Sequence, residues 1–133
     1  MARQLIVAAR HSRIVASRVR MHEFGITESI INIVLDKAKE AEANRVTKIS
    51  LVAGELSGFV PDCIQFYFEF LSKGSPAEGA TLHFESPPAQ IRCRDCSTVF
   101  HPQDTVWTCP SCQSESVEIE GGRELYVKSI EVE

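Results

Sequence analysis

Two pairs of cysteines are the residues with the clearest chemistry in this sequence of 133 residues. Cys93 and Cys96 form one Cys-x-x-Cys pair, Cys109 and Cys112 form the other, and 12 residues separate the pairs. Four thiolates on two short turns suit the tetrahedral coordination of Zn²⁺, and a shell of four sulfurs leaves no position for water or substrate. The spacing therefore predicts a structural zinc site in a ribbon-like hairpin.

Redox chemistry is the competing interpretation of these cysteine pairs. It is disfavoured, because no thioredoxin-like βαβ pattern precedes either pair. No convincing secretory signal directs the chain to an oxidising compartment, so a reducing cytoplasm is the expected location. The fifth cysteine, Cys63, is expected to be a small buried apolar residue with no role as ligand or nucleophile.

Met21, His22 and Glu23 form a second group with metal-binding chemistry. An imidazole close to a free amine can join that amine and the intervening backbone nitrogens around one ion, a nitrogen-rich set suited to planar Ni²⁺. The full set requires Met21 to be the N-terminus, because a preceding chain converts its amine into an amide. On residue types alone, the favoured interpretation of His22 is an exposed histidine without a function, and Glu23 is equally a residue that stabilises a helix start.

Two helices are predicted from apolar residues that recur at steps of three and four. The first is expected over 27–43, with Thr27 as its N-cap and Asn44 ending it in a left-handed conformation. The second is expected over 61–73, since Pro61 is a typical first residue of a helix.

Alternating apolar residues predict four strands, over 46–53, 81–85, 90–92 and 124–132. The cysteine segment falls between the last two strands, where Phe100 and Trp107 are expected to fill a small core. This order predicts an α+β fold, in which a small sheet with two helices carries an inserted zinc-ribbon lobe.

Charge changes sign along the chain. Residues 1–20 contain five arginines and no acid, whereas the remainder contains 9 basic and 18 acidic residues. The first 20 residues are interpreted as an N-terminal extension, either a leader or a misassigned start, with an organelle transit peptide as the alternative. An acidic body repels phosphate backbones, so we expect no nucleic-acid partner. No apolar run approaches the roughly 18 residues of a membrane span, so we expect no membrane partner either.

Four short motifs occur in a distinctive order: Met-His-Glu at 21–23, Gly-Glu-Leu at 54–56, Cys-Pro-x-Cys at 109–112 and Gly-x-Glu-Leu at 122–125. With this combination the chain from Met21 to Glu133 resembles the HypA/HybF family of hydrogenase-maturation nickel metallochaperones. The resemblance implies a protein that is not an enzyme and that delivers nickel for maturation of [NiFe]-hydrogenase. It also implies that His22 is the essential nickel ligand, with Met21 and Glu23 beside it, while zinc is structural.

Pro87 with Pro88 and Gly121 with Gly122 mark two crossings that divide the chain, and the resemblance implies a set of partners. A nickel-binding α+β domain is expected over 21–86 plus 121–133, and a zinc-ribbon domain over 87–120. The implied partners are a HypB-type GTPase, the large subunit of a [NiFe]-hydrogenase and, in some members, urease maturation factors. A homodimer is compatible with the sequence.

Two other classes of function compete with this interpretation. A zinc-ribbon module that binds nucleic acid or a protein complex is the main alternative, since Arg92, Arg94 and nearby aromatic residues offer local support. A zinc hydrolase or thiol oxidoreductase is disfavoured, because a catalytic zinc needs an open coordination position. No nucleophile-elbow or His-Glu-x-x-His motif is present.

Overall fold

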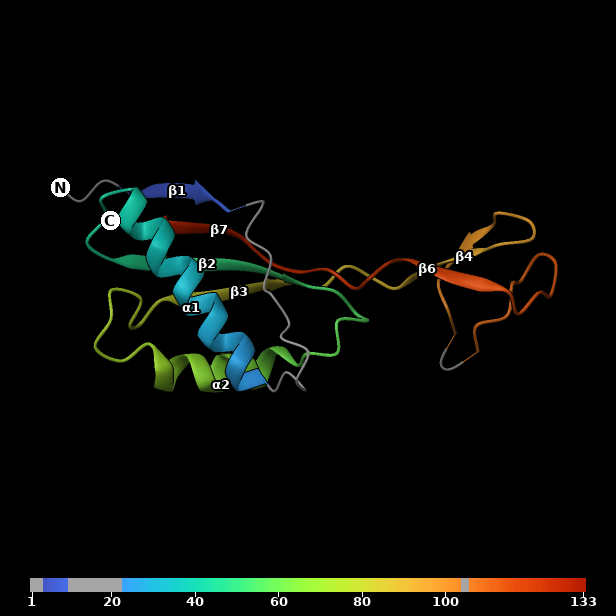
Figure 1. Cartoon of the computed structure of the whole chain (residues 1–133), viewed down its shortest axis with the longest axis horizontal. Helices are drawn as coiled ribbons and strands as arrows, with labels where there is room; N and C mark the ends of the chain where they lie inside the picture. Colours follow the sequence, from blue (N-terminus) through green and yellow to red (C-terminus); the bar gives the residue numbers. More distant parts are fainter. Residues whose placement is uncertain (1–3, 10–22, 104–105) are drawn as a thin grey trace. The chain divides into compact units, whose positions relative to one another are not determined.

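The computed structural model describes residues 4–9, 23–103 and 106–133 (Figure 1). Two compact units make up this part of the chain. The ribbon unit comprises Ala53–Gly58 and Ser86–Glu124, and the body unit comprises the rest. The assignment of a nickel-binding domain and a zinc-ribbon domain to particular ranges stays a prediction.

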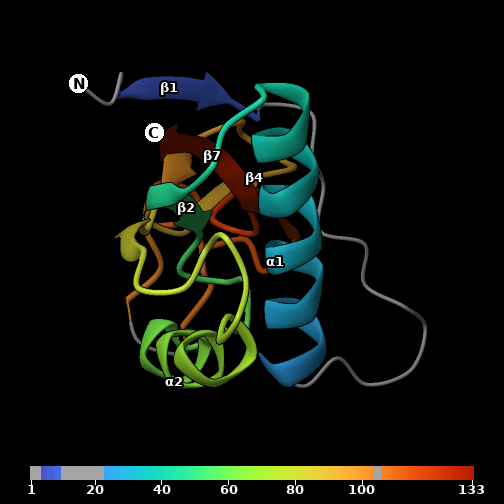
Figure 2. The same cartoon turned by 90° about the vertical axis from the view of Figure 1, so that its left-hand side faces the viewer.

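The body unit is a four-stranded sheet with the strand order β1-β7-β2-β3. The strands are β1 (Leu5–Ala8), β2 (Val46–Ala53), β3 (Thr81–Glu85) and β7 (Leu125–Val132). β1 pairs antiparallel with β7, whereas β2 and β3 are parallel. Parallel neighbours need a crossover connection, which helix α2 (Pro61–Leu71) provides. Figure 2 shows α1 (Glu23–Glu40) and α2 on one side of the sheet.

Helix α1 buries one face against the sheet and against α2. Ile26, Ile30, Val34 and Ala38 are almost fully buried, and their spacing of four residues places them on one stripe of the helix. The expected α+β class is confirmed, and the helix predicted from this periodicity is present.

Both predicted ends of α1 were wrong. The helix begins at Glu23, and Thr27 lies inside it, where its hydroxyl donates a hydrogen bond of 2.6 Å to the Glu23 carbonyl oxygen. Thr27 is fully buried, so it packs as a core residue and does not cap the helix. At the other end Glu42, with φ 55°, adopts the left-handed conformation that was expected at Asn44. The Asn44 amide instead donates to the Glu133 carbonyl oxygen of the body unit at 2.9 Å.

Strand β1 lies within the segment interpreted as an extension, where no strand was expected. Its four residues pair with 129–132 of β7, and the Ala9 amide continues the pairing with a hydrogen bond of 2.9 Å to the Lys128 carbonyl oxygen. Ala9 is buried in the main core, but Leu5 and Ile6 are exposed. The strand therefore covers the edge of β7 while contributing little apolar burial.

A chain that begins at Met21 is expected to fold and to lose only about 1–2 kcal/mol of unfolding free energy, because among residues 4–9, the part of this segment that the structure describes, Val7 and Ala9 are the residues packed in the core. Urea denaturation of the full and shortened chains measures the difference. As a control, Leu5→Ser in the full chain should leave stability unchanged, because this side chain is half exposed. Failure of the shortened chain to fold would contradict the expectation.

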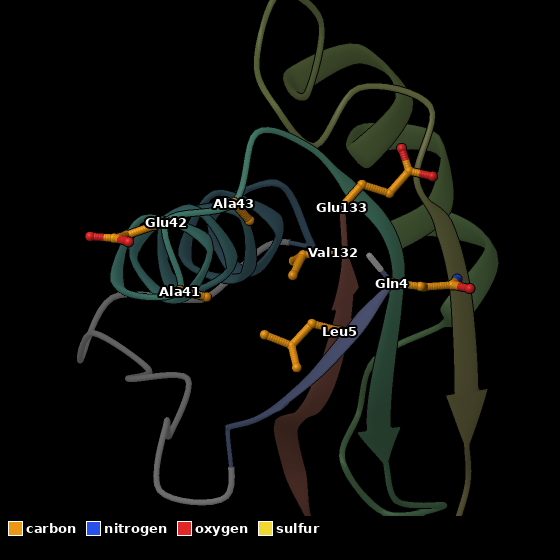
Figure 3. A pocket seen from close by; sticks show the side chains of 7 residues that line it. All are labelled: Gln4, Leu5, Ala41, Glu42, Ala43, Val132 and Glu133. Atoms are coloured by element: carbon orange, nitrogen blue, oxygen red, sulfur yellow. The ribbon is translucent and has the colours of Figure 1, made fainter. Parts of the chain in front are cut away.

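A pocket of about 450 Å³ opens where β1, the end of α1 and the end of β7 meet (Figure 3). Its walls mix polar and apolar side chains from Gln4, Leu5, Ala41, Glu42, Ala43, Val132 and Glu133. The pocket is lined by two glutamates but by no histidine or cysteine, so its chemistry differs from that of the predicted metal sites.

The ribbon unit is built on a small antiparallel sheet in the order β5-β4-β6. Its strands are β4 (Gln90–Cys93), β5 (Val99–Phe100) and β6 (Val117–Gly121). The buried apolar residues in the described part of this unit are Ala53, Ala89, Ile91, Cys93 and Cys109. Phe100 and Trp107 are only half-buried, so the expectation that they fill the core was too strong.

Candidate metal centre

The four predicted cysteines lie together at the tips of two similar turns in the ribbon unit. In the first turn the Ser97 amide donates to the Cys93 carbonyl oxygen at 2.9 Å, and in the second the Gln113 amide donates to the Cys109 carbonyl oxygen at 2.9 Å. Ser97 and Gln113 both have positive φ, 63° and 66°. Each turn folds back on itself in the same way, so each directs both of its thiols to one point.

The arrangement of the sulfur atoms fits a tetrahedral ion. All four Sγ atoms lie within 4.8 Å of one another, and two Sγ–Sγ distances, Cys93–Cys112 and Cys96–Cys109, are 3.5 Å. Zinc–sulfur bonds of about 2.3 Å in a regular tetrahedron give sulfur–sulfur edges of about 3.8 Å. Among the described residues this is the one group of three or more His, Cys, Asp or Glu ligand atoms placed to hold a metal ion.

The ionisation of the thiols shows why this cluster favours a cation. Hydrogen bonding with Thr98, whose hydroxyl oxygen lies 3.1 Å from the Cys96 sulfur, lowers the pKa of Cys96 to about 6. At Cys112 the backbone hydrogen bond with Ser114 lowers the pKa of the thiol. This effect is outweighed by hydrogen bonding with the Cys93 thiol, by desolvation and by the other two thiols, and the pKa of Cys112 is raised to about 12. Zinc coordination requires each cysteine to be a thiolate, so a divalent cation that binds the cluster displaces the thiol protons.

The Gly-Glu-Leu turn at 54–56 closes the base of the ribbon unit through three backbone hydrogen bonds. The Gly54 amide donates to the Glu124 carbonyl oxygen at 2.7 Å, the Glu55 amide to Pro87 at 2.9 Å and the Leu56 amide to Gly122 at 2.6 Å. We call this set of contacts the clasp. It joins three segments that are far apart in the sequence, and it includes both Gly-Glu-Leu and Gly-x-Glu-Leu motifs.

The Glu55 carboxylate adds two side-chain contacts to the clasp. Its Oε2 accepts a hydrogen bond of 2.7 Å from the Ala89 amide and lies 3.1 Å from His101 Nε2. The amide of Ala89 and, second, the imidazole of His101 hold the pKa of Glu55 below its ordinary value of 4.5. Because this acidic pKa is lowered on folding, the carboxylate stabilises the ribbon unit above pH 4.5, and that contribution is lost as the pH falls through the lowered value.

Carbon-13 NMR is expected to show the Glu55 carboxyl more than half ionised at pH 4.5 in zinc-loaded protein. In His101→Ala the ionised fraction at this pH should fall while staying above one half, since the Ala89 amide is the larger cause of the shift. Glu85 is the internal control, because Lys128 Nζ, 2.9 Å away, lowers its pKa independently of His101. An unshifted Glu55 titration would contradict the role given to the Ala89 amide.

Comparison with known proteins shows which family the chain belongs to. The family model HypA, described as hydrogenase/urease nickel incorporation, metallochaperone, matches residues 21–132. The chain belongs to the HypA family. This family assignment confirms the interpretation of the chain as a nickel metallochaperone of hydrogenase maturation, and it explains why the four sequence motifs occur together.

Individual HypA proteins resemble the chain over most of their length. The hydrogenase maturation factor HypA of Dehalococcoides mccartyi (strain CBDB1) is 42% identical over 113 residues, which cover 85% of this chain and 95% of that protein. HypA of Caldanaerobacter subterraneus subsp. tengcongensis is 37% identical over 114 residues and is covered completely. The solution structure of the Ni metallochaperone HypA from Helicobacter pylori gives a TM-score of 0.61 with 28% identity, covering 84% of this chain and 97% of that chain.

The residues predicted to bind nickel lie at the start of the region shared with HypA. Glu23 is the first residue of α1 and is half-buried. Met21 and His22 lie outside the described residues. Of the other histidines, the two that the structure describes do not join the cysteines: His101 contacts Glu55, and His83 is exposed on β3.

The residues of the clasp were missed as structural determinants. Gly-Glu-Leu at 54–56 and Gly-x-Glu-Leu at 122–125 served only as family motifs in the sequence. A Gly-Glu-Leu motif before the cysteine pairs and a Gly-x-Glu-Leu motif after them are the signal that was available. Their meaning depends on backbone contacts between segments separated by more than 60 residues, which periodicity does not reveal.

Proposed function

We propose that this chain binds nickel through His22, with Met21 and Glu23 beside it, and delivers the ion for maturation of [NiFe]-hydrogenase. The observation that supports this most is the match to the HypA family. The matched region begins at Met21, the first residue of the Met-His-Glu motif. In the same proposal, Cys93, Cys96, Cys109 and Cys112 hold structural zinc, so the cargo ion needs a separate site.

The two sites suit different tasks because their ligands differ. Four thiolates that close a tetrahedron retain zinc and make its binding energy available to fold the ribbon unit. One imidazole with backbone nitrogens near the start of α1 binds nickel less tightly and leaves positions open for ligands from a recipient. Delivery is then an exchange of ligands on the ion, and no bond in a substrate is broken. We therefore infer that the chain is not an enzyme.

The backbone before His22 decides how many nitrogens the nickel site has. With residues 1–20 attached, Met21 offers an amide nitrogen, whereas a chain that begins at Met21 offers an amine. Nickel binds tightly to an amine, while an amide must lose its proton before it can coordinate. We propose that the chain beginning at Met21 has the higher nickel affinity near neutral pH.

The partners follow from the family. We propose a HypB-type GTPase and the large subunit of a [NiFe]-hydrogenase, and the family description extends the recipients to urease. Neither described helix has the length and apolarity needed to cross a bilayer. We propose a cytoplasmic location because thiolate zinc sites persist in a reducing compartment.

Nucleic-acid binding by the ribbon unit finds little support. Arg92 and Arg94, the cations on which that interpretation depends, form ion pairs with Glu120 and Glu118 across the β4–β6 pair. Their charge is therefore offset before any phosphate approaches. We propose that nucleic acid is not a partner of this chain.

A competitive nickel titration of zinc-loaded protein tests the proposed site. His22→Ala is expected to weaken nickel binding by at least tenfold in a chain beginning at Met21, because the imidazole is the one side-chain nitrogen in the set. His83→Ala is the matched control, since it removes an exposed imidazole from β3 and should leave the affinity unchanged. Equal affinity in His22→Ala and the unmodified chain would remove the proposed nickel site.

A further inference from the structure

Helix α2 presents aromatic side chains to solvent on the face opposite the core. Phe66 is 67% exposed and Phe70 is 64% exposed, and Cys63 is exposed one turn earlier. Their spacing of three and four residues aligns them along one side of the helix, and we call them the α2 stripe. The core face of the same helix is formed by Ile64 and Phe68, which are buried. The stripe is therefore apolar surface that the packing of the body unit does not need.

Further apolar residues extend the stripe toward the start of α1. Tyr67 contacts Phe66 edge to face with ring centroids 5.4 Å apart, and it contacts Phe24 of α1 in the same way at 5.5 Å. Phe24 is 39% exposed, and Val60, just before α2, is 50% exposed. Phe24 is only two residues after His22 in the chain. The patch is therefore continuous with the helix start that follows the proposed nickel ligand.

Charged residues on α2 define one flank of the stripe. Asp62 and Glu69 are seven residues apart, so they lie on the same side of the helix, and both are exposed. Glu69 also accepts a hydrogen bond of 3.1 Å from Gln65. At the end of the helix Lys73 places its Nζ 6.0 Å from the centroid of the Phe70 ring. A complementary surface needs cations opposite the two acids and an apolar face opposite the aromatic rings.

The size and charge of the patch favour a different protein over a second copy of this chain. A phenylalanine side chain offers about 150–250 Å², so the exposed parts of the patch amount to roughly 500 Å². A standard stable interface buries about 800 Å² on each partner, so this patch suits an encounter that forms and dissolves. Two copies of this chain, each with a net charge of −4, also repel one another. Metal transfer requires brief association, and the acidic residues beside the stripe favour a basic partner.

We propose that the α2 stripe, with Phe24 and Val60, is the docking surface for the protein that exchanges nickel with this chain. The partner presents an apolar helix face or groove flanked by lysine or arginine residues. Docking there brings its ligands to the start of α1. This inference rests on the proposed function, because it takes the nickel ligand to be His22.

The test uses calorimetry to measure how tightly the zinc-loaded full chain binds two probes. The probes are the HypB-type GTPase and the hydrogenase large subunit. The double variant Phe66→Ser, Phe70→Ser is expected to lose at least tenfold in affinity for one probe, because buried aromatic anchors dominate interfaces of this kind. The double variant Ile6→Ser, Val106→Ser is the matched control, because it removes two comparably exposed apolar side chains elsewhere and should bind within twofold of the unmodified chain. Asp62→Lys, Glu69→Lys should weaken binding at low salt and make it less salt-dependent.

Nickel titration of the same variants separates this inference from the proposed function. If Phe66→Ser, Phe70→Ser keeps its nickel affinity but loses affinity for the probe, docking at the stripe is supported. If this variant binds the probe as tightly as the unmodified chain, docking at the stripe is overturned and the proposed nickel site is unaffected. Absence of binding by the unmodified chain to both probes also overturns it. A photoreactive benzoylphenylalanine in place of Phe66 identifies the occupant. Adducts with a second copy, or with residues 1–22 of the same chain, would overturn the proposal.

Discussion

Cys109→Ser is expected to release zinc and to unfold the ribbon unit while the body unit stays folded. Structural zinc in small domains contributes an apparent binding free energy on the order of 10–16 kcal/mol, and this energy supports folding. The ribbon unit has few buried apolar residues of its own, and two of them, Cys93 and Cys109, belong to the tetrad. Loss of one thiolate therefore removes both a ligand and part of the core.

Zinc content by atomic emission and amide NMR spectra of the two units measure this effect. A zinc content near zero and collapsed amide signals from the ribbon unit are expected, with the body-unit signals preserved because its own core contains no tetrad residue. Cys63→Ser provides the control. Cys63 is exposed on α2, contrary to the expectation that it is buried, so its loss should leave one zinc per chain. Retention of zinc by Cys109→Ser would contradict the structural role given to the tetrad.

Gly54→Ala is expected to destabilise the ribbon unit by about 3 kcal/mol or more, because the new methyl group has no space. A Cβ at Gly54 would lie 2.1 Å from the Gly122 carbonyl oxygen and 2.4 Å from its carbon, both of which are backbone atoms. Gly122 cannot move away easily. Its own position is fixed by a positive φ of 106° and by Ala89, whose Cα would lie 2.8 Å from a Cβ at Gly122.

Thermal unfolding with zinc held in excess measures the loss. Gly25→Ala is the matched control, because nothing lies within 4 Å of a Cβ at this position of α1. Alanine favours a helix over glycine by roughly 0.5–1 kcal/mol, so the control variant should gain stability. If Gly54→Ala were as stable as the unmodified chain, the clasp would not hold the base of the ribbon unit in solution.

The sequence by itself determined the elements whose information is local. The Cys-x-x-Cys spacing predicted the tetrad because each pair needs only one short turn to bring two thiols together, and the two turns share the same hydrogen bonding. Helical periodicity placed α1 and α2 within a few residues of their observed bounds, and alternation located β2 and β3. The family motifs gave the function for a similar reason, because short ordered motifs are visible without knowledge of contacts.

Tertiary structure alone decided the features that depend on partners distant in sequence. β1 exists because β7, more than a hundred residues later, offers an edge to pair with, and nothing in the amino-terminal segment shows that edge. Gly54 is required because Gly122 approaches it. Helix α2 has apolar residues on almost every side, so only its packing determined that Ile64 and Phe68 are buried while Cys63, Phe66 and Phe70 face solvent. Local spacing fixes which structure a segment favours, whereas burial, edge pairing and close backbone contact arise only when distant segments meet.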